Sequence, residues 1–295
     1  MVRDRSWGAI AFDVLNHGIL LAAGLLCLLP LIHTVAVSFS STAAAMAHRV
    51  TLWPIGFNVA NYSYNLRSRQ FFDSFFISVM RTIGGTLFNV VVTVLAAYPL
   101  AIKETFRGKE VFKWLLIISM LFSGGLIPWY LALRSLGLIN KLWALILPGA
   151  ISAWNIIIAL NFFRGLPPEL AESAEIDGAS HFDILFRIYL PLSLPMLATI
   201  TLFTAVRHWN SWFDALVVMT NARHYPLQTY LQTTMVLPTL PLTAMTGNDP
   251  ELMVLLSDRA LKGALIVLAT LPILMLYPLL QRYFIHGMTL GSVKE

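Results

Sequence analysis

The sequence predicts an all-α protein that crosses a membrane with six helices and carries an elbow of two short helices on the cytoplasmic side. Hydrophobic residues make up 57% of the 295-residue chain and charged residues only 12%, against roughly 25% charged in an ordinary soluble domain. The apolar residues also fall in runs of about twenty, the length that an α-helix needs to cross the hydrocarbon of a bilayer. These two observations argue against a water-soluble enzyme.

Six windows of about nineteen apolar residues define the spans, and we expect them to form a single transmembrane domain over residues 1–295. In chain order the spans are 16–38, 75–102, 112–133, 142–163, 191–208 and 263–284. We interpret the first as an uncleaved helix, because its apolar run is too long for a secretory signal. Glycine and proline interrupt the later spans, either for close helix packing or as kinks that line a translocation path.

The distribution of basic residues predicts that both termini lie in the cytoplasm. With the termini inside, lysine and arginine are denser in the inner loops than in the outer ones, and the short second loop carries Lys103, Arg107, Lys109 and Lys113. Short loops rich in basic residues stay on the cytoplasmic side. The net charge of +5 comes from scattered residues, so basic membrane flanks explain it better than nucleic-acid binding. The single Cys27 excludes an internal disulfide and a cysteine-based metal site.

Four sizeable polar stretches lie between the spans, at 39–74, 103–111, 164–190 and 209–262. The stretch 164–190, which we place inside, carries local signals of two helices. The first helix begins after Pro167-Pro168, with an acidic first turn near the positive end of the helix dipole. It ends at Asp177-Gly178, where glycine can adopt a positive φ, and Ser180 with Asp183 then forms a capping box. Lipid-surface helices are usually basic, so this acidic elbow is better explained by docking to a protein partner than by a linker resting on lipid.

The elbow resembles the EAA motif of binding-protein-dependent ABC importer permeases, which reads E-A-A-x-x-D-G-A, eight residues, I-x-L-P. Here Glu172-Ser-Ala-Glu-Ile-Asp177-Gly178-Ala179 is followed after eight residues by Ile188-Tyr-Leu-Pro191. Only Ser173 departs from the pattern, in place of an alanine. Further similarity lies at 52–54, 122–128, 142–149 and 208–214. Together these segments resemble the carbohydrate-importer branch related to MalG, and within it the LplC/YtcP-like permeases of oligosaccharide and polysaccharide uptake, alginate importers included.

The resemblance implies that the elbow is a coupling helix seated in a cleft of a cytoplasmic ATPase subunit. The residues assigned to this coupling are Glu172, Ser173, Ala174, Asp177, Gly178, Ala179, Ile188 and Pro191. The resemblance also implies a multi-pass protein of the bacterial inner membrane that pairs with a second homologous permease, an ATPase dimer and an extracytoplasmic solute-binding protein. ATP and magnesium would bind to the ATPase subunits, and this chain would bind no cofactor. The C-terminal residues 287–295 resemble a tail that reaches toward the ATPase dimer.

Aromatic and amide side chains near the outer ends of the spans are candidates for the substrate path, because sugars bind to aromatic faces and planar polar groups. The first set is Trp209, Asn210, Trp212 and Asp214, for which an interfacial aromatic belt is the other interpretation. The weaker set is Tyr130, Trp154, Asn155 and Asn161, for which helix packing or interhelical hydrogen bonding is favoured.

Arg81 is a charge inside an apolar span, which by default marks a functional site. Its long side chain could instead snorkel to the outer interface. Arg207 and His208 lie at a comparable outer level, and the three cations together would attract an anionic sugar. They favour an acidic, alginate-like cargo.

The sequence contains no signature of a nucleotide-hydrolysing or hydrolase site. It has no G-x-x-x-x-G-K-[ST] phosphate loop, no H-E-x-x-H and no G-x-S-x-G. We therefore predict a non-catalytic subunit that couples ATP hydrolysis by its partner to alternating access of an oligosaccharide or polysaccharide path. The alternative is a self-sufficient ion-coupled secondary transporter or channel, which six spans and an intramembrane arginine allow, although the paired repeats typical of such proteins are not evident.

Overall fold

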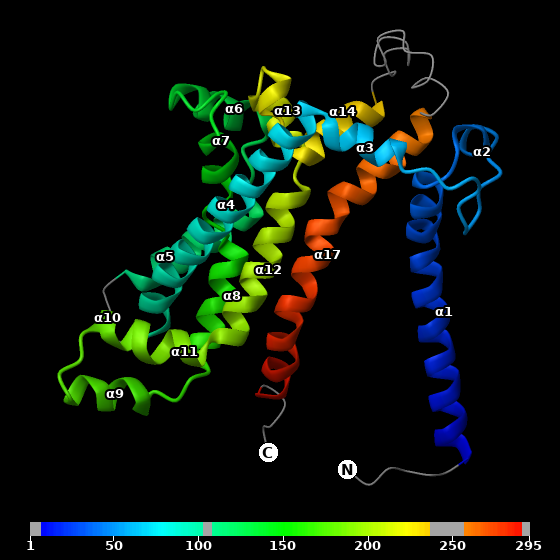
Figure 1. Cartoon of the computed structure of the whole chain (residues 1–295). Coiled ribbons are helices and arrows are strands. Elements are labelled where there is room, and N and C mark those ends of the chain that lie inside the picture. Colours follow the sequence, from blue (N-terminus) through cyan, green and yellow to red (C-terminus); the bar gives the residue numbers. More distant parts are fainter. Residues whose placement is uncertain (1–6, 103–107, 237–256, 291–295) are drawn as a thin grey trace. The chain divides into compact units, whose positions relative to one another are not determined.

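The computed structural model describes residues 7–102, 108–236 and 257–290, the stretch 277–290 by its backbone (Figure 1). Every regular element in these ranges is a helix. The described residues divide into two compact units. One comprises 7–69, 233–236 and 257–270, and the other comprises 70–102, 108–232 and 271–290.

The first unit is a small helical assembly. It contains the helices α1 (Trp7–Ser38), α2 (Thr42–Met46), α3 (Ala60–Arg67) and the first part of α17 (Asp258–Leu290). Alanine side chains such as Ala36, Ala45 and Ala260 form its core, so the helices approach closely. Asn65 links α3 to α17, because its amide nitrogen donates to the backbone oxygen of Leu261 at 3.2 Å. Most of α1 is exposed in the single chain, which leaves its apolar surface available to lipid or to another subunit.

The second unit is a bundle capped by short helices at both ends. Its elements are α4 (Arg69–Ala101), α5 (Lys109–Leu121), α6 (Leu126–Ser135), α7 (Trp143–Ile146), the 3-10 turn η1 (Leu147–Gly149), α8 (Ala153–Arg164), α9 (Glu169–Ile176), α10 (His181–Ile184), the π-helical turn η2 (Leu185–Tyr189), α11 (Leu190–Leu192), α12 (Leu194–Asn210), α13 (Phe213–Val218), η3 (Ala222–His224), the first part of α14 (Leu227–Val236) and the second part of α17. Its main core lies between α4, α8 and α12, where Ala97, Ala159 and Ile200 are fully buried. Figure 1 shows α9 to α11 at one end of these helices and α6, α7 and α13 at the other.

Three of the predicted spans are continuous helices and three are broken. The continuous ones are Trp7–Ser38, Arg69–Ala101 and Asp258–Leu276, each long and apolar enough to cross a membrane. Three further spans arise if each bent pair of helices crosses once. The bends are 119° between α5 and α6, 46° between α7–η1 and α8, and 81° between α10–α11 and α12. The all-α membrane fold is therefore confirmed, while the span boundaries and the single domain stay predictions.

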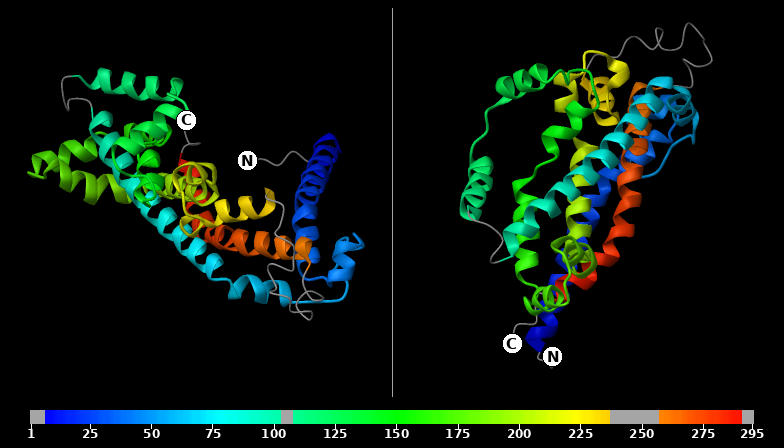
Figure 2. Two further views of the ribbon diagram at one scale, coloured as in Figure 1. Left: turned by 90° about the horizontal axis from the view of Figure 1, so that it is seen from above. Right: turned by 90° about the vertical axis from the view of Figure 1, so that its left-hand side faces the viewer.

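Glycine and proline explain where the bent pairs break. Gly125, between α5 and α6, has a φ of +81°, in the left-handed region that glycine adopts without strain. Figure 2 shows the extended connection that results between these two helices. Pro148 lies within η1, where it has no N–H to continue a helical hydrogen-bond pattern. The glycine and proline residues within these segments therefore end helices. As a result, neither 112–133 nor 142–163 forms one straight helix.

Candidate functional site

The charge inside the membrane-spanning part of α4 is buried and compensated. Arg81 is 2% exposed, its Nη1 donates to the backbone oxygen of Ser211 at 3.0 Å, and its Nη2 forms an ion pair with the Asp214 carboxylate. The other carboxylate oxygen of Asp214 accepts from the Ser211 hydroxyl and from the N–H of Ala215, both at 2.9 Å. A buried charge is tolerated when it is paired and hydrogen-bonded. Arg81 therefore lies in the interior, and it joins α4 to the beginning of α13.

Arg207 is placed differently although it lies nearby on α12. Its side chain is exposed, and its Nη2 donates to the backbone oxygen of Gly149 at 2.7 Å. This carbonyl lies at the end of η1, where the chain leaves the helix, so Arg207 and Asn89 share in satisfying it. No carboxylate pairs with Arg207 among the described residues, which distinguishes it from Arg81.

His208 fills the space between two glycines. The side chain is 3% exposed, and its Nε2 makes no hydrogen bond within the described part of the chain. A Cβ atom added at Gly85 would lie 2.5 Å from Nε2, and one at Gly149 would lie 3.0 Å from the ring carbon Cε1. Glycine at these two positions is therefore what lets the imidazole pack between α4 and η1.

One cavity of about 480 Å³ is lined by Arg81, Arg207, His208 and Asp214, and its volume lies within the range of about 300–1,000 Å³ found for small-molecule sites. Its polar lining consists of Arg81, Ser123, Arg207, His208, Ser211 and Asp214. Trp129 and Phe213 add aromatic surface. Four residues predicted for the substrate path thus come together here from three helices, Arg81 from α4, Arg207 and His208 from α12, and Asp214 from α13.

The other predicted path residues lie outside the lining of this cavity. Asn155 is buried and hydrogen-bonded, Trp209 is buried edge-on against Phe75, and Trp212 contacts Phe213 edge-on. Tyr130 packs against the small core around Leu133, while Trp154, Asn161 and Asn210 are exposed. Packing is therefore the observed environment of Trp209 and Tyr130, and a sugar contact for these seven residues stays a prediction.

A buried amide network holds the broken fourth span against its neighbours. Asn89 of α4 donates to the backbone oxygens of Gly149 and Ala150, each at 3.0 Å. Asn155 of α8 donates to Asn89 Oδ1 at 2.8 Å and to the Thr204 hydroxyl of α12 at 3.0 Å. The sequence indicated a hydrogen bond for Asn155. It gave no reason to single out Asn89 or Trp129, because an asparagine within a span and one aromatic among many carry no distinctive spacing.

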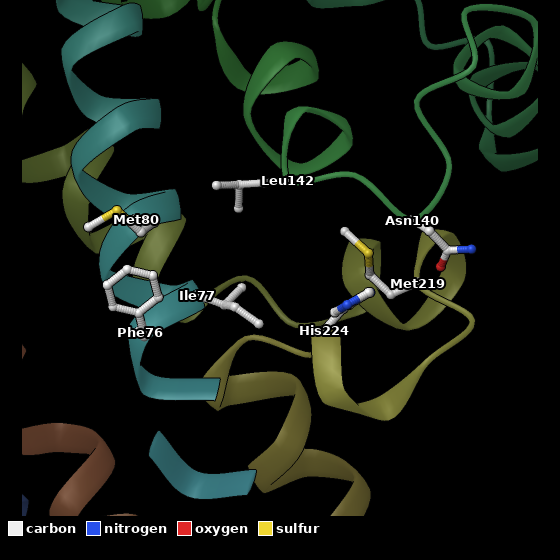
Figure 3. Close-up of a pocket in the computed structure, with 7 residues that line it drawn as sticks. All are labelled: Phe76, Ile77, Met80, Asn140, Leu142, Met219 and His224. Carbon is white, nitrogen blue, oxygen red and sulfur yellow. The ribbon is translucent and has the colours of Figure 1, made fainter. Parts of the chain in front are cut away.

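A second, smaller cavity of about 230 Å³ lies near the N-terminal end of α4. Figure 3 shows Phe76, Ile77 and Met80 of α4 facing Leu142 and Met219 across it. Asn140 and His224 are the polar members of an otherwise apolar lining.

The elbow has the predicted local structure. Helix α9 ends at Ile176, followed by Gly178 with a φ of +82°. Ser180 and Asp183 form both hydrogen bonds of the capping box at the start of α10. The hydroxyl and N–H of Ser180 donate to the Asp183 carboxylate and hold the pKa of that group below its ordinary value. The turn is thus defined by backbone geometry and by charge-assisted hydrogen bonds.

Aromatic side chains fix the elbow to the ends of two spanning helices. The ring centroid of Tyr98 on α4 lies 5.3 Å from that of Tyr189 and 6.4 Å from that of His181. Phe163 at the end of α8 meets Tyr189 edge-on at 5.6 Å. Ile184 is fully buried in the same core. A force on the elbow would therefore pass directly to α4 and α8.

The other side of the elbow is open in the single chain. Ile176 is 86% exposed, and the acidic side chains of Glu169, Glu172 and Glu175 are exposed beside it. Of the residues assigned to coupling, Glu172, Ser173, Asp177, Gly178 and Pro191 are exposed, while Ala174, Ala179 and Ile188 are half-buried against the core. The open face of α9 therefore combines one apolar side chain with three carboxylates, and its docking to another protein stays a prediction.

The family model described as the binding-protein-dependent transport system inner membrane component matches residues 54–288. The chain belongs to this family. Protein LplC of Bacillus subtilis (strain 168) is 43% identical over 283 residues, which cover 96% of this chain and 95% of LplC. The polygalacturonan/rhamnogalacturonan transport system permease protein YtcP of the same organism is 38% identical over 286 residues, covering 96% and 98% of the two chains.

A solved structure of this family has the same fold. It is a chain from the crystal structure of a bacterial ABC transporter involved in the import of the acidic polysaccharide alginate, with a TM-score of 0.87 and 34% sequence identity. The similarity covers 95% of this chain and 99% of that one. The chain is therefore a multi-pass inner-membrane permease component of a binding-protein-dependent ABC importer, as the EAA motif predicted.

Proposed function

We propose that this permease imports an acidic oligosaccharide or polysaccharide. The observation that carries the proposal is similarity along nearly the whole chain to two transport systems named for acidic polysaccharides, one for polygalacturonan and rhamnogalacturonan and one for alginate. The cavity beside α12 supports it independently. Its ionised groups are Arg81, Asp214 and Arg207, of which the first two form an ion pair, so a positive charge is left for an anionic cargo.

Coupling to ATP hydrolysis runs through the elbow in this proposal. Glu172 to Ala179 dock on a cytoplasmic ATPase subunit, and closure of the ATPase dimer moves α4 and α8 through the Tyr98, Phe163 and Tyr189 contacts. The spans then open the central path outward, and hydrolysis returns it inward. The complex contains a second homologous permease, two ATPase subunits and an extracytoplasmic solute-binding protein.

The chain itself is the non-catalytic membrane subunit, with both termini in the cytoplasm. ATP and magnesium bind to the partner ATPase, which accords with the missing phosphate-loop motif. Among the residues described by the structure, no three histidine, cysteine or acidic side chains gather in a way that could hold a metal ion. The acidic elbow has no evident use in a self-sufficient ion-driven transporter, so that alternative is less well supported.

The proposal is tested by ATPase activity of the purified complex, co-expressed with its operon neighbours and supplied with loaded binding protein. We expect uronic oligosaccharides to stimulate hydrolysis more strongly than neutral ones of equal length. Equal stimulation by both would reject the acidic cargo. Failure of any ATPase subunit to co-purify would reject the coupling role and favour the ion-driven transporter.

A further inference from the structure

The two arginines of the cavity differ in how many of their hydrogen-bond donors are already used. Arg81 is buried; its Nη1 donates to the backbone oxygen of Ser211 and its Nη2 pairs with the Asp214 carboxylate. Arg207 uses Nη2 for the backbone oxygen of Gly149 and is exposed. A guanidinium carries five N–H donors. Arg207 therefore presents unused donors from an exposed side chain, whereas Arg81 is buried, with Nη1 and Nη2 bonded to the protein and Nε without a partner among the described residues.

The charge balance of the cavity leads to the same distinction. The positive charge of Arg81 is cancelled by Asp214, and the Asp214 carboxylate is held further by Ser211 and Ala215. Arg207 has no such carboxylate among the described residues that line the cavity. An arriving carboxylate would thus meet one uncompensated cation, already oriented by its bond to Gly149.

We infer that Arg207 is the carboxylate-binding residue of a uronate subsite in this cavity, and that the Arg81–Asp214 pair positions the cavity wall without contacting the cargo. This inference rests on the proposed function and assigns the acid selectivity to one side chain. The free edge of the Arg207 guanidinium can receive a carboxylate in the paired geometry that arginine favours. Trp129 and Phe213 supply the aromatic surface on which a sugar ring can lie.

The test is ATP-driven uptake into proteoliposomes containing the whole complex, with a short oligogalacturonate as the acidic probe and its methyl ester as the uncharged one. Rates of each variant are compared with wild type for the same probe. We expect Arg207→Gln to lower oligogalacturonate uptake about tenfold, equivalent to about 1.4 kcal/mol. Uptake of the methyl ester should stay within about twofold. Arg134→Gln, which removes an exposed cation of α6 outside the cavity, should leave both rates unchanged.

A second pair of variants tests the same subsite without altering Arg207. Ser123 lines the cavity, and its hydroxyl accepts a hydrogen bond from the N–H of Gly125, a bond that aspartate and asparagine can both replace. Ser123→Asp adds a negative charge that competes for Arg207, so it should lower uptake of the acid about as much as Arg207→Gln does. Ser123→Asn, which matches aspartate in size without its charge, should change uptake of the acid and of the ester by the same factor.

The possible outcomes separate this inference from the proposed function. Selective loss of acid uptake in Arg207→Gln and Ser123→Asp supports the subsite. Wild-type acid uptake in both, or equal loss of acid and ester, overturns it while the proposed function still stands. If the wild-type complex transports neither probe, the proposed function itself fails, and the subsite fails with it.

Discussion

Substitution of Gly178 by valine should uncouple transport without preventing assembly. Gly178 has a φ of +82°, and a Cβ atom added there would meet no atom of this chain within 4 Å. The cost within the chain is therefore backbone strain alone, about 1–2 kcal/mol for a residue with a side chain in the left-handed region. A bias of that size changes a conformational equilibrium about 5–30-fold, enough to shift the elbow away from the arrangement that α9 needs for docking.

The assay for this substitution is ATP-driven uptake by the reconstituted complex, with the amount of assembled complex measured by gel filtration. We expect Gly178→Val to assemble normally and to lose at least about nine-tenths of uptake. Gly178→Asn is the matched control, because asparagine tolerates the left-handed region better than valine, and it should retain much more activity. Uptake at the wild-type rate by Gly178→Val would refute the claim that the elbow transmits force through this turn.

Three further predictions concern stability, measured as the midpoint of thermal unfolding of the detergent-purified complex. Arg81→Met should destabilise the complex by about 3–5 kcal/mol, because it leaves the Asp214 carboxylate unpaired. Adding Asp214→Leu should restore most of the lost stability. A double variant as unstable as Arg81→Met alone would contradict the pairing. Gly85→Ala should lower the stability of the complex by about 1–3 kcal/mol through overpacking against His208. His208→Ala in the same chain should restore part of that stability. If it restores none, the clash lies elsewhere. Ser180→Ala removes the cap of α10 and should cost about 1 kcal/mol, while Ser180→Thr should be nearly neutral.

The elbow was predictable because its determinants are local. A glycine at the end of α9 and the Ser180–Asp183 pair three residues apart specify their hydrogen bonds within a few residues of chain. The same holds for the apolar length of α1 and α4, which composition alone indicates. Where a segment's structure follows from its own residues, the sequence predicts it well.

The cavity was predictable only in part because its pairings are distant. Arg81 and Asp214 drew attention separately, but nothing in their spacing of 133 residues indicates that they form an ion pair. The sharp bend at Gly125 was foreseen as an interruption and not as a turn of 119°. Such angles depend on how α5 and α6 pack against other helices, which a window of twenty residues does not contain.

We expect ATP hydrolysis to drive this permease through contacts between the ATPase and the elbow at 169–191. The most direct measurement is cysteine cross-linking to the ATPase subunit, in a Cys27→Ser background that contains no other cysteine. Glu172→Cys, on the exposed face of α9, should cross-link to the ATPase, with a yield that changes between the ATP-bound and nucleotide-free complexes. Arg134→Cys on α6, at the opposite end of the bundle, should give no such product. An assembled complex in which Glu172→Cys never cross-links to the ATPase would contradict the account.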